Sequence, residues 1–165
     1  MWLTTWQTVQ LGQYPSTQAI RAALTAKNVK LSSWPEELID GVPLATKSQT
    51  VRLALVRPSQ LFPGRNVRLT TIFKEVTTRL GGSLCSPEVG LILHLQVDTD
   101  YHTLYAVAME PLVVADKSQV LFSVENGIGS SYRMLRGLDG NRNRVWNQHG
   151  DLCLDYFVVQ IKDDA

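Results

Sequence analysis

Cysteine, long apolar runs and net charge are all scarce in this chain of 165 residues. Its two cysteines, Cys85 and Cys153, lack the C-x-x-C spacing of zinc and redox motifs and lie among apolar residues, so we expect buried, reduced thiols. The longest apolar run, residues 89–95, is far too short for a transmembrane helix. The net charge of +1 neither favours nor excludes a polyanionic partner.

Sequence motifs of known catalytic or phosphate-binding sites are absent as well. No G-x-S-x-G nucleophile elbow surrounds the serines near Cys85. Gly127-Ile128-Gly129 lacks the strand-then-helix context of a phosphate-binding loop. Whether the protein is an enzyme is therefore left open by its motifs.

Four candidate metal ligands lie within nine residues: His94, Asp98, Asp100 and His102. Imidazole and carboxylate groups together suit zinc or another divalent ion. The segment joins a predicted helix to a predicted strand, however, where Asp-Thr-Asp is ordinary turn chemistry. We therefore predict a solvated turn, with no metal and no cofactor.

Length and composition predict a single domain over residues 1–165, because a chain with 44% apolar residues can bury a core of its own. The first residues, Met-Trp-Leu-Thr-Thr-Trp-Gln, lack the basic start and apolar run of a signal peptide. A cytoplasmic protein with no membrane partner is expected.

Charge is distributed unevenly along the chain. Residues 1–82 carry a net charge of +6 and residues 83–165 a net charge of −5. Attraction between the two halves is the simpler interpretation, and different partners for two faces is the alternative.

Helical signals dominate the first part of the chain. A helix is predicted from about Ser16 to Asn28, and a short helix from about Ser33. The clearest helix has apolar residues at helical spacing along one face, namely Leu69, Ile72, Phe73, Val76 and Leu80. Another helix is expected over residues 87–95, because Ser86-Pro87-Glu88 supplies a cap and a first turn.

Strand-like segments dominate the second half, at residues 103–109, 119–125, 131–136 and 152–161, and earlier ones lie at 6–11 and 50–56. Consecutive strands without helices between them favour an antiparallel meander. The predicted class is α+β, with two or three helices of the first half packed on a curled antiparallel sheet formed mainly by the second half.

The most polar stretch, residues 140–151, is the first candidate binding surface. Amides, guanidinium groups and one indole together are typical of a carbohydrate, nucleotide or peptide site. The candidate ligand-binding residues are Asn141, Arg142, Arg144, Trp146, Asn147 and His149. A hydrated loop anchored by Trp146 is the structural alternative.

Two further groupings could carry function. Glu88 and Glu110 lie beside prolines, where two convergent carboxylates would serve as an acid–base pair. In the loop 57–68, Arg57, Arg65 and Arg68 could grip phosphates and Phe62 could stack on a base.

The chain resembles a family of small bacterial proteins without an assigned function. The similar stretches follow the same order in both and are residues 6–12, 84–90, 108–112, 121–125 and 145–147. The family has arginine in place of His94 and lacks the cluster at residues 98–102. The resemblance implies a bacterial cytosolic origin and leaves the function open.

Three functional classes remain from the sequence. A non-catalytic binding or interaction module, with a protein or small-molecule partner, is favoured because no catalytic constellation stands out. A hydrolase or transferase that uses Glu88 and Glu110 is the first alternative. A nucleic-acid-binding protein that uses the basic first half is the second.

Overall fold

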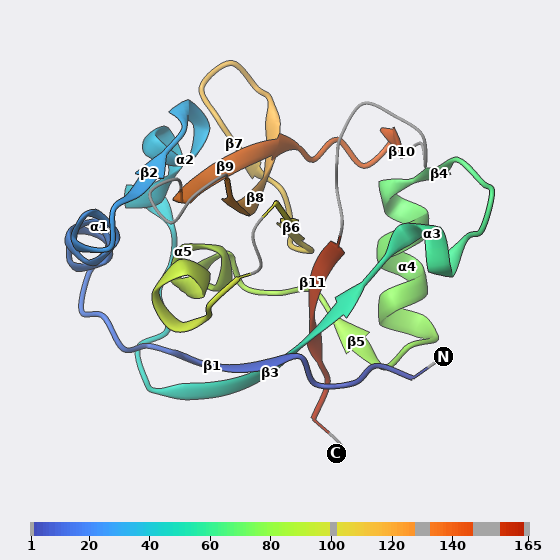
Figure 1. Cartoon of the computed structure of the whole chain (residues 1–165). Helices are drawn as coiled ribbons and strands as arrows, with labels where there is room; N and C mark the ends of the chain where they lie inside the picture. The colour runs from blue at the N-terminus through green and yellow to red at the C-terminus, as the bar shows by residue number, and fades with distance from the viewer. Residues whose placement is uncertain (1, 100–101, 128–132, 147–155, 164–165) are drawn as a thin grey trace.

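The computed structural model describes residues 2–99, 102–127, 133–146 and 156–163, and this part of the chain forms a large sheet curved around one helix (Figure 1). Nine strands make up the sheet within the described residues, in the order β1-β3-β11-β6-β8-β9-β2, with β5 beside β11 and β7 beside β8. They are β1 (Gln7–Leu11), β2 (Val29–Leu31), β3 (Gln49–Val56), β5 (Gly82–Ser83), β6 (Leu104–Val107), β7 (Leu112–Val113), β8 (Gln119–Asn126), β9 (Arg133–Asp139) and β11 (Tyr156–Ile161). A separate two-stranded ribbon pairs β4 (Val67–Arg68) with β10 (Val145–Trp146).

Five α-helices and one 3-10 helix belong to the described residues. They are α1 (Thr17–Ala26), α2 (Ser33–Leu38), η1 (Ile39–Gly41), α3 (Pro58–Leu61), α4 (Leu69–Thr78) and α5 (Pro87–Gln96). Within these residues, none of the helices combines the length and the apolar character needed to cross a lipid bilayer.

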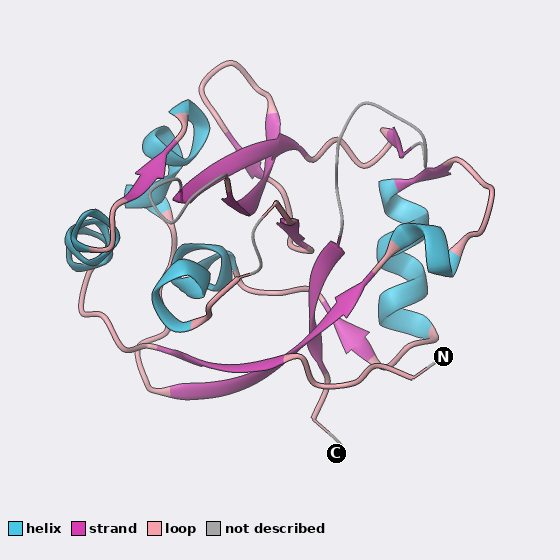
Figure 2. Cartoon of the chain, in the orientation of Figure 1, coloured by secondary structure: helices cyan, strands magenta, loops and turns pink. Residues whose placement is uncertain are grey.

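Helix α5 occupies the middle of the molecule, with β1 and β3 on one side and β8 and β9 on the other (Figures 1 and 2). It contacts β1, β6, β8, β9 and α1, and every residue from Glu88 to Leu95 is buried. Ser86 caps the helix by accepting the N–H of Glu88, and Pro87 occupies the first turn. A short helix that is apolar on all sides is stable only when neighbours cover it all round.

Helix α4 lies outside the curve of the sheet, on the opposite side of β3 and β11 from α5 (Figure 2). The apolar face predicted for this helix is confirmed for Leu69, Ile72, Phe73 and Val76, which are buried; Leu80 is buried too but lies two residues after the helix ends. Phe73 meets Phe157 of β11 edge to face, with ring centroids 5.9 Å apart. The two helices thus cover opposite faces of β11.

The predicted antiparallel sheet of the second half is wrong. The sheet is mixed, since β11 pairs in parallel with β6 and β2 pairs in parallel with β9. Three of its strands, β1, β2 and β3, come from the first half of the chain, and β5 spans the midpoint. The helices also lie on both faces of the sheet, whereas the sequence predicted one helical layer.

The error has a physical cause in the connections between strands. Strands β6, β8 and β9 do form the expected antiparallel series. Strand β11, however, lies on the far side of β6 and pairs there with β3, about one hundred residues earlier in the chain. Local patterns indicate that a segment is a strand but carry no information on such a distant neighbour.

Candidate functional site

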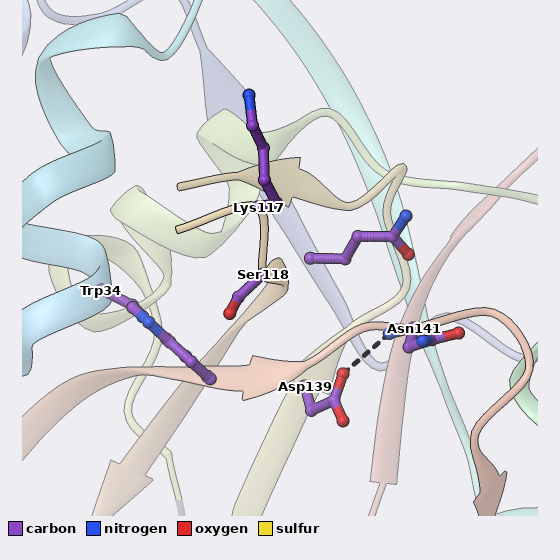
Figure 3. Close-up of a pocket in the computed structure, with 6 residues that line it drawn as sticks. Trp34, Lys117, Ser118, Asp139 and Asn141 are labelled. Atoms are coloured by element: carbon purple, nitrogen blue, oxygen red, sulfur yellow. Dashed lines mark hydrogen bonds between the residues drawn. The ribbon is translucent and has the colours of Figure 1, made fainter. Parts of the chain in front are cut away.

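A surface hollow of about 320 Å³ lies beside α2, between the turn before β8 and the end of β9 (Figure 3). Three separate segments supply the residues that line it: Trp34, Lys117, Ser118, Gln119, Asp139 and Asn141. We refer to this site as the Trp34 hollow. Only Asn141 belongs to the residues that the sequence singled out.

Trp34 can lie against β9 because residue 137 is glycine. A β-carbon on Gly137 would come within 2.9 Å of two side-chain atoms of Trp34. A larger residue there would displace the indole, since packed interiors leave no room at that distance. Trp34 remains partly exposed, so the indole is fixed on one side and open to a ligand on the other.

The turn between β7 and β8 holds the opposite rim of the hollow. Lys117 adopts a left-handed backbone conformation, with φ of 74°, and donates its N–H to the carbonyl of Val114 at 3.0 Å. Asp116 accepts the N–H of Ser118 at 2.8 Å. Hydrogen bonds from the Ser118 hydroxyl and N–H lower the pKa of Asp116. This turn places Lys117 and Ser118 at the rim of the hollow, and the Lys117 side chain extends away from Trp34 and Asp139 (Figure 3).

Asp139 provides the negative charge of the hollow. One carboxylate oxygen accepts the N–H of Asn141 at 3.0 Å, as Figure 3 shows. The other lies 3.9 Å from the guanidinium of Arg144, and half of the side chain is exposed. The carboxylate therefore keeps acceptor capacity for a ligand hydroxyl or amine. Together with the indole and the amides, it makes a polar site with one aromatic wall.

The predicted ligand loop is divided between the hollow and the core. Asn141 lines the hollow, and the exposed Arg142 pairs with Glu110. The guanidinium of Arg144 lies over the ring of Trp146. Trp146 is only 7% exposed and packs edge to face on Phe157, with ring centroids 5.3 Å apart. This burial favours the anchoring role of Trp146 over contact with a ligand. Asn147 and His149 lie outside the described residues.

The two carboxylates of the predicted acid–base pair have different partners. Glu88 is 1% exposed and accepts the N–H of Gly12 at 2.8 Å and the N–H of Ala45 at 2.7 Å. Glu110 is exposed and pairs with Arg142. Glu88 thus holds two loops together with both of its oxygens. The acid–base pair stays a prediction that these contacts do not favour.

The residues of the predicted nucleic-acid loop differ in exposure. The guanidinium of Arg57 donates a hydrogen bond of 2.7 Å to the hydroxyl oxygen of Tyr156. Its central carbon lies 4.7 Å from the centroid of the same ring. Phe62 is partly buried against the core, whereas Arg65 and Arg68 are exposed. Within the described part of the chain, neither of these two exposed arginines makes an ion pair. They are therefore the members of the group that remain open to a partner.

The two loops that the sequence treated separately form one surface. Arg68 of β4 lies opposite Val145 of β10 in the ribbon. The carbonyls of Arg142 and Arg144 accept the first N–H groups of α4, from Thr70 and Leu69, each at 3.1 Å. The backbones of Arg68, Arg142 and Arg144 thus meet at the start of α4.

Charge pairing between the two halves of the chain is rare among the residues that the structure describes. Arg52 and Asp163, 3.7 Å apart, form the one ion pair that joins them. The other pairs lie within one half, as in the clamp of Arg21 on Glu36 and Asp40. Mutual attraction of the halves therefore accounts for little of the charge split.

His94 of the predicted turn and the thiol of Cys85 have structural partners. The ring Nε2 of His94 lies 3.0 Å from the carbonyl of Met134, and burial lowers the pKa of this histidine, with a further contribution from Arg133. No group of three metal-binding side chains occurs among the described residues, which omit Asp100. Cys85 is buried, and burial raises its pKa to about 12, so its thiolate is scarce at neutral pH.

Sequence reasoning missed five of the six residues of the Trp34 hollow. Trp34, Lys117, Ser118, Gln119 and Asp139 were not among the candidate site residues. The only sequence signal for this site is the polar segment that precedes the strand predicted at residues 119–125. The comparisons add no further information, since no family model, no curated protein and no solved structure matches this chain.

Proposed function

We propose that this protein is a non-catalytic binding module that holds a polar small molecule, of carbohydrate type, in the Trp34 hollow. The observation that carries the proposal is the convergence of one partly exposed indole with carboxylate, amide and hydroxyl groups around about 320 Å³. Binding sites of small molecules combine such an apolar wall with a few polar groups that fix orientation.

Carbohydrate matches this lining better than an apolar ligand does. A sugar ring has one apolar face of C–H groups, which packs on an indole, and a rim of hydroxyls. Asp139 accepts from such hydroxyls, and Gln119 and Asn141 both donate and accept. The open shape of the hollow suits a ligand that remains partly hydrated.

The contacts of Glu88 support a non-catalytic role. A general acid or base needs a carboxylate that can reach the ligand. Both oxygens of Glu88 already accept backbone N–H groups from Gly12 and Ala45, and Glu110 is paired with Arg142. An acid–base reaction would have to displace these partners first.

Replacement of Trp34 by alanine tests the proposal. A screen of neutral and charged oligosaccharides would select a ligand, and titration calorimetry would measure its affinity for each variant. Trp34→Ala is expected to weaken binding about 30-fold, since loss of an aromatic anchor costs about 2 kcal/mol. Trp2→Ala is the matched control, because Trp2 is 85% exposed and far from the hollow in sequence. Equal affinities of the two variants, or no sugar ligand at all, would contradict the proposal.

A second candidate function, binding of single-stranded nucleic acid, is favoured by the β4–β10 ribbon. This pairing brings Arg68 of one loop close to Arg142 and Arg144 of the other, and Arg65 lies three residues before Arg68 in an exposed loop. Arginines from two segments around one helix start can grip successive phosphates. Glu110 and Asp139 lie in the same region and reduce the positive charge, which is why this function ranks second.

Salt dependence distinguishes this second function. The affinity for a labelled oligonucleotide would be measured by fluorescence anisotropy over a range of salt concentrations. Replacing Arg65 and Arg68 by glutamine should reduce the slope of log affinity against log salt by about 1.4, since each phosphate contact on a single strand contributes about 0.7. Lys30→Gln, an exposed substitution on β2, should leave the slope unchanged. No measurable affinity at low salt would exclude this function.

A further inference from the structure

The Trp34 hollow has two walls that come from separate segments of the chain. One wall is α2, which carries Trp34, and the other is the turn at residues 114–118 between β7 and β8, which carries Lys117 and Ser118 (Figure 3). A helix and a hairpin turn share no backbone ladder. The space left for a ligand therefore depends on what holds the turn against the helix.

The α2 wall is fixed from the side of α1 and the sheet. The guanidinium of Arg21 donates to the carboxylates of Glu36 and Asp40, at 2.5 and 3.1 Å, and to the carbonyl of Glu36 at 3.0 Å. Trp34 also packs against the backbone of Gly137 in β9. These contacts involve no residue of the turn, so they hold α2 in place independently of it.

The turn wall adopts a backbone conformation that depends on its surroundings. The left-handed φ of 74° at Lys117 is less favourable for a lysine than for a glycine. The N–H of Val114 donates to the carbonyl of Ser118 at 3.1 Å and closes the turn. Such a conformation persists only where neighbouring groups hold it. A contact from outside the hairpin therefore contributes to the shape of this wall.

Glu37 supplies such a contact. Its Oε1 accepts the N–H of Ala115 at 2.9 Å, and both residues are exposed. Glu37 follows Trp34 by three residues in α2, so the two side chains lie on the same face of the helix. A hydrogen bond from a backbone N–H to a carboxylate is stronger than one between neutral groups. Within the described part of the chain, this hydrogen bond links the two walls.

We infer that Glu37 is a positioning residue of the Trp34 hollow, a role that rests on the proposed binding of a ligand there. Its carboxylate ties the turn to α2 and holds the hollow at the width that the ligand needs. A site that is already ordered binds more tightly, because binding does not have to fix a loose segment. Glu37 does not line the hollow, so it acts through Ala115 and not by touching the ligand.

Hydrogen exchange of the Ala115 amide, followed by NMR spectroscopy, tests the tether in the free protein. Glu37→Ala should make this amide exchange about tenfold faster, because its acceptor is lost. Glu37→Gln keeps an acceptor oxygen and should retain most of the protection. Glu36→Ala is the matched control, since this exposed carboxylate of the same helix pairs with Arg21. An unchanged exchange rate in Glu37→Ala would overturn the inference.

Titration calorimetry with cellobiose, diacetylchitobiose and digalacturonate as probes tests the effect on binding. Glu37→Ala should weaken the tightest of these about tenfold, because the turn must then be ordered on binding. Glu37→Gln should restore most of the affinity, and Glu36→Ala should leave it unchanged. A freed Ala115 amide without loss of affinity, or an equal loss in the alanine and glutamine variants of Glu37, would contradict the positioning role.

The Trp34→Ala variant separates failure of this role from failure of the proposed function. If Trp34→Ala weakens binding and Glu37→Ala does not, the hollow is the binding site and Glu37 does not position it. If no probe binds the unmodified protein, the function itself is contradicted and Glu37 is at most a structural tether. Loss of affinity in both variants, with rescue by Glu37→Gln, is the expected result.

Discussion

The Phe157→Ala variant is expected to lose about 3–5 kcal/mol of unfolding free energy, because truncation of a fully buried ring leaves a cavity. Phe157 is 0% exposed and packs edge to face on two rings, those of Phe73 in α4 and Trp146 in β10. Its loss should loosen β11, α4 and the ribbon together. Urea unfolding followed by circular dichroism measures the change.

Val145→Ala is the control for this prediction. Val145 precedes Trp146 in the ribbon but is 52% exposed, so its truncation should change the free energy of unfolding by less than about 0.5 kcal/mol. If both variants unfolded at the same urea concentration, Phe157 would not be the centre of the packing between β11 and α4.

Glu88→Ala is expected to destabilise the protein by about 2–4 kcal/mol. The substitution leaves the N–H groups of Gly12 and Ala45 without their acceptor, and each such loss costs about 1–3 kcal/mol. Gly12 has a left-handed φ of 74°, and a β-carbon there would lie 2.4 Å from the carbonyl oxygen of Lys47. Without Glu88, this tight turn after β1 loses its tie to α5. Thermal and urea unfolding would both report the change.

Glu88→Gln and Glu110→Ala separate this structural role from a catalytic one. Glutamine keeps one acceptor oxygen, so Glu88→Gln should lose roughly half as much stability. Glu110→Ala removes only an exposed ion pair and should cost at most about 1 kcal/mol. If Glu88→Ala were as stable as Glu110→Ala, the carboxylate would be free for other chemistry, and the acid–base hypothesis would regain support.

The positions of most elements could be predicted from the sequence, because helical and strand periodicity are local. The apolar face of α4 and the cap of α5 at Ser86 are examples. The neighbours of each strand could not be predicted. Nothing near Tyr156 indicates that it lies beside Tyr105, since their parallel pairing depends on the packing of the whole sheet.

The candidate site could be predicted only in part for the same reason. Asn141 was recognised because it lies in a visibly polar loop. Trp34 and Lys117 are far apart in sequence and meet at the hollow only because α2 packs on β9 and the turn before β8 lies beside it. Trp146 resembled a ligand contact in sequence, and its burial became apparent only once Phe157 was placed against it.

The place of β11 between β3 and β6 affects how the chain folds. Residues 156–161 are the last strand of the described chain to leave the ribosome, yet they join β1–β3 to the rest of the sheet. Until then, the facing edges of β3 and β6 have no partner and can pair with other chains. The edges of β3 and β6 are therefore the places where a chain whose β11 is still unpaired would associate with other chains.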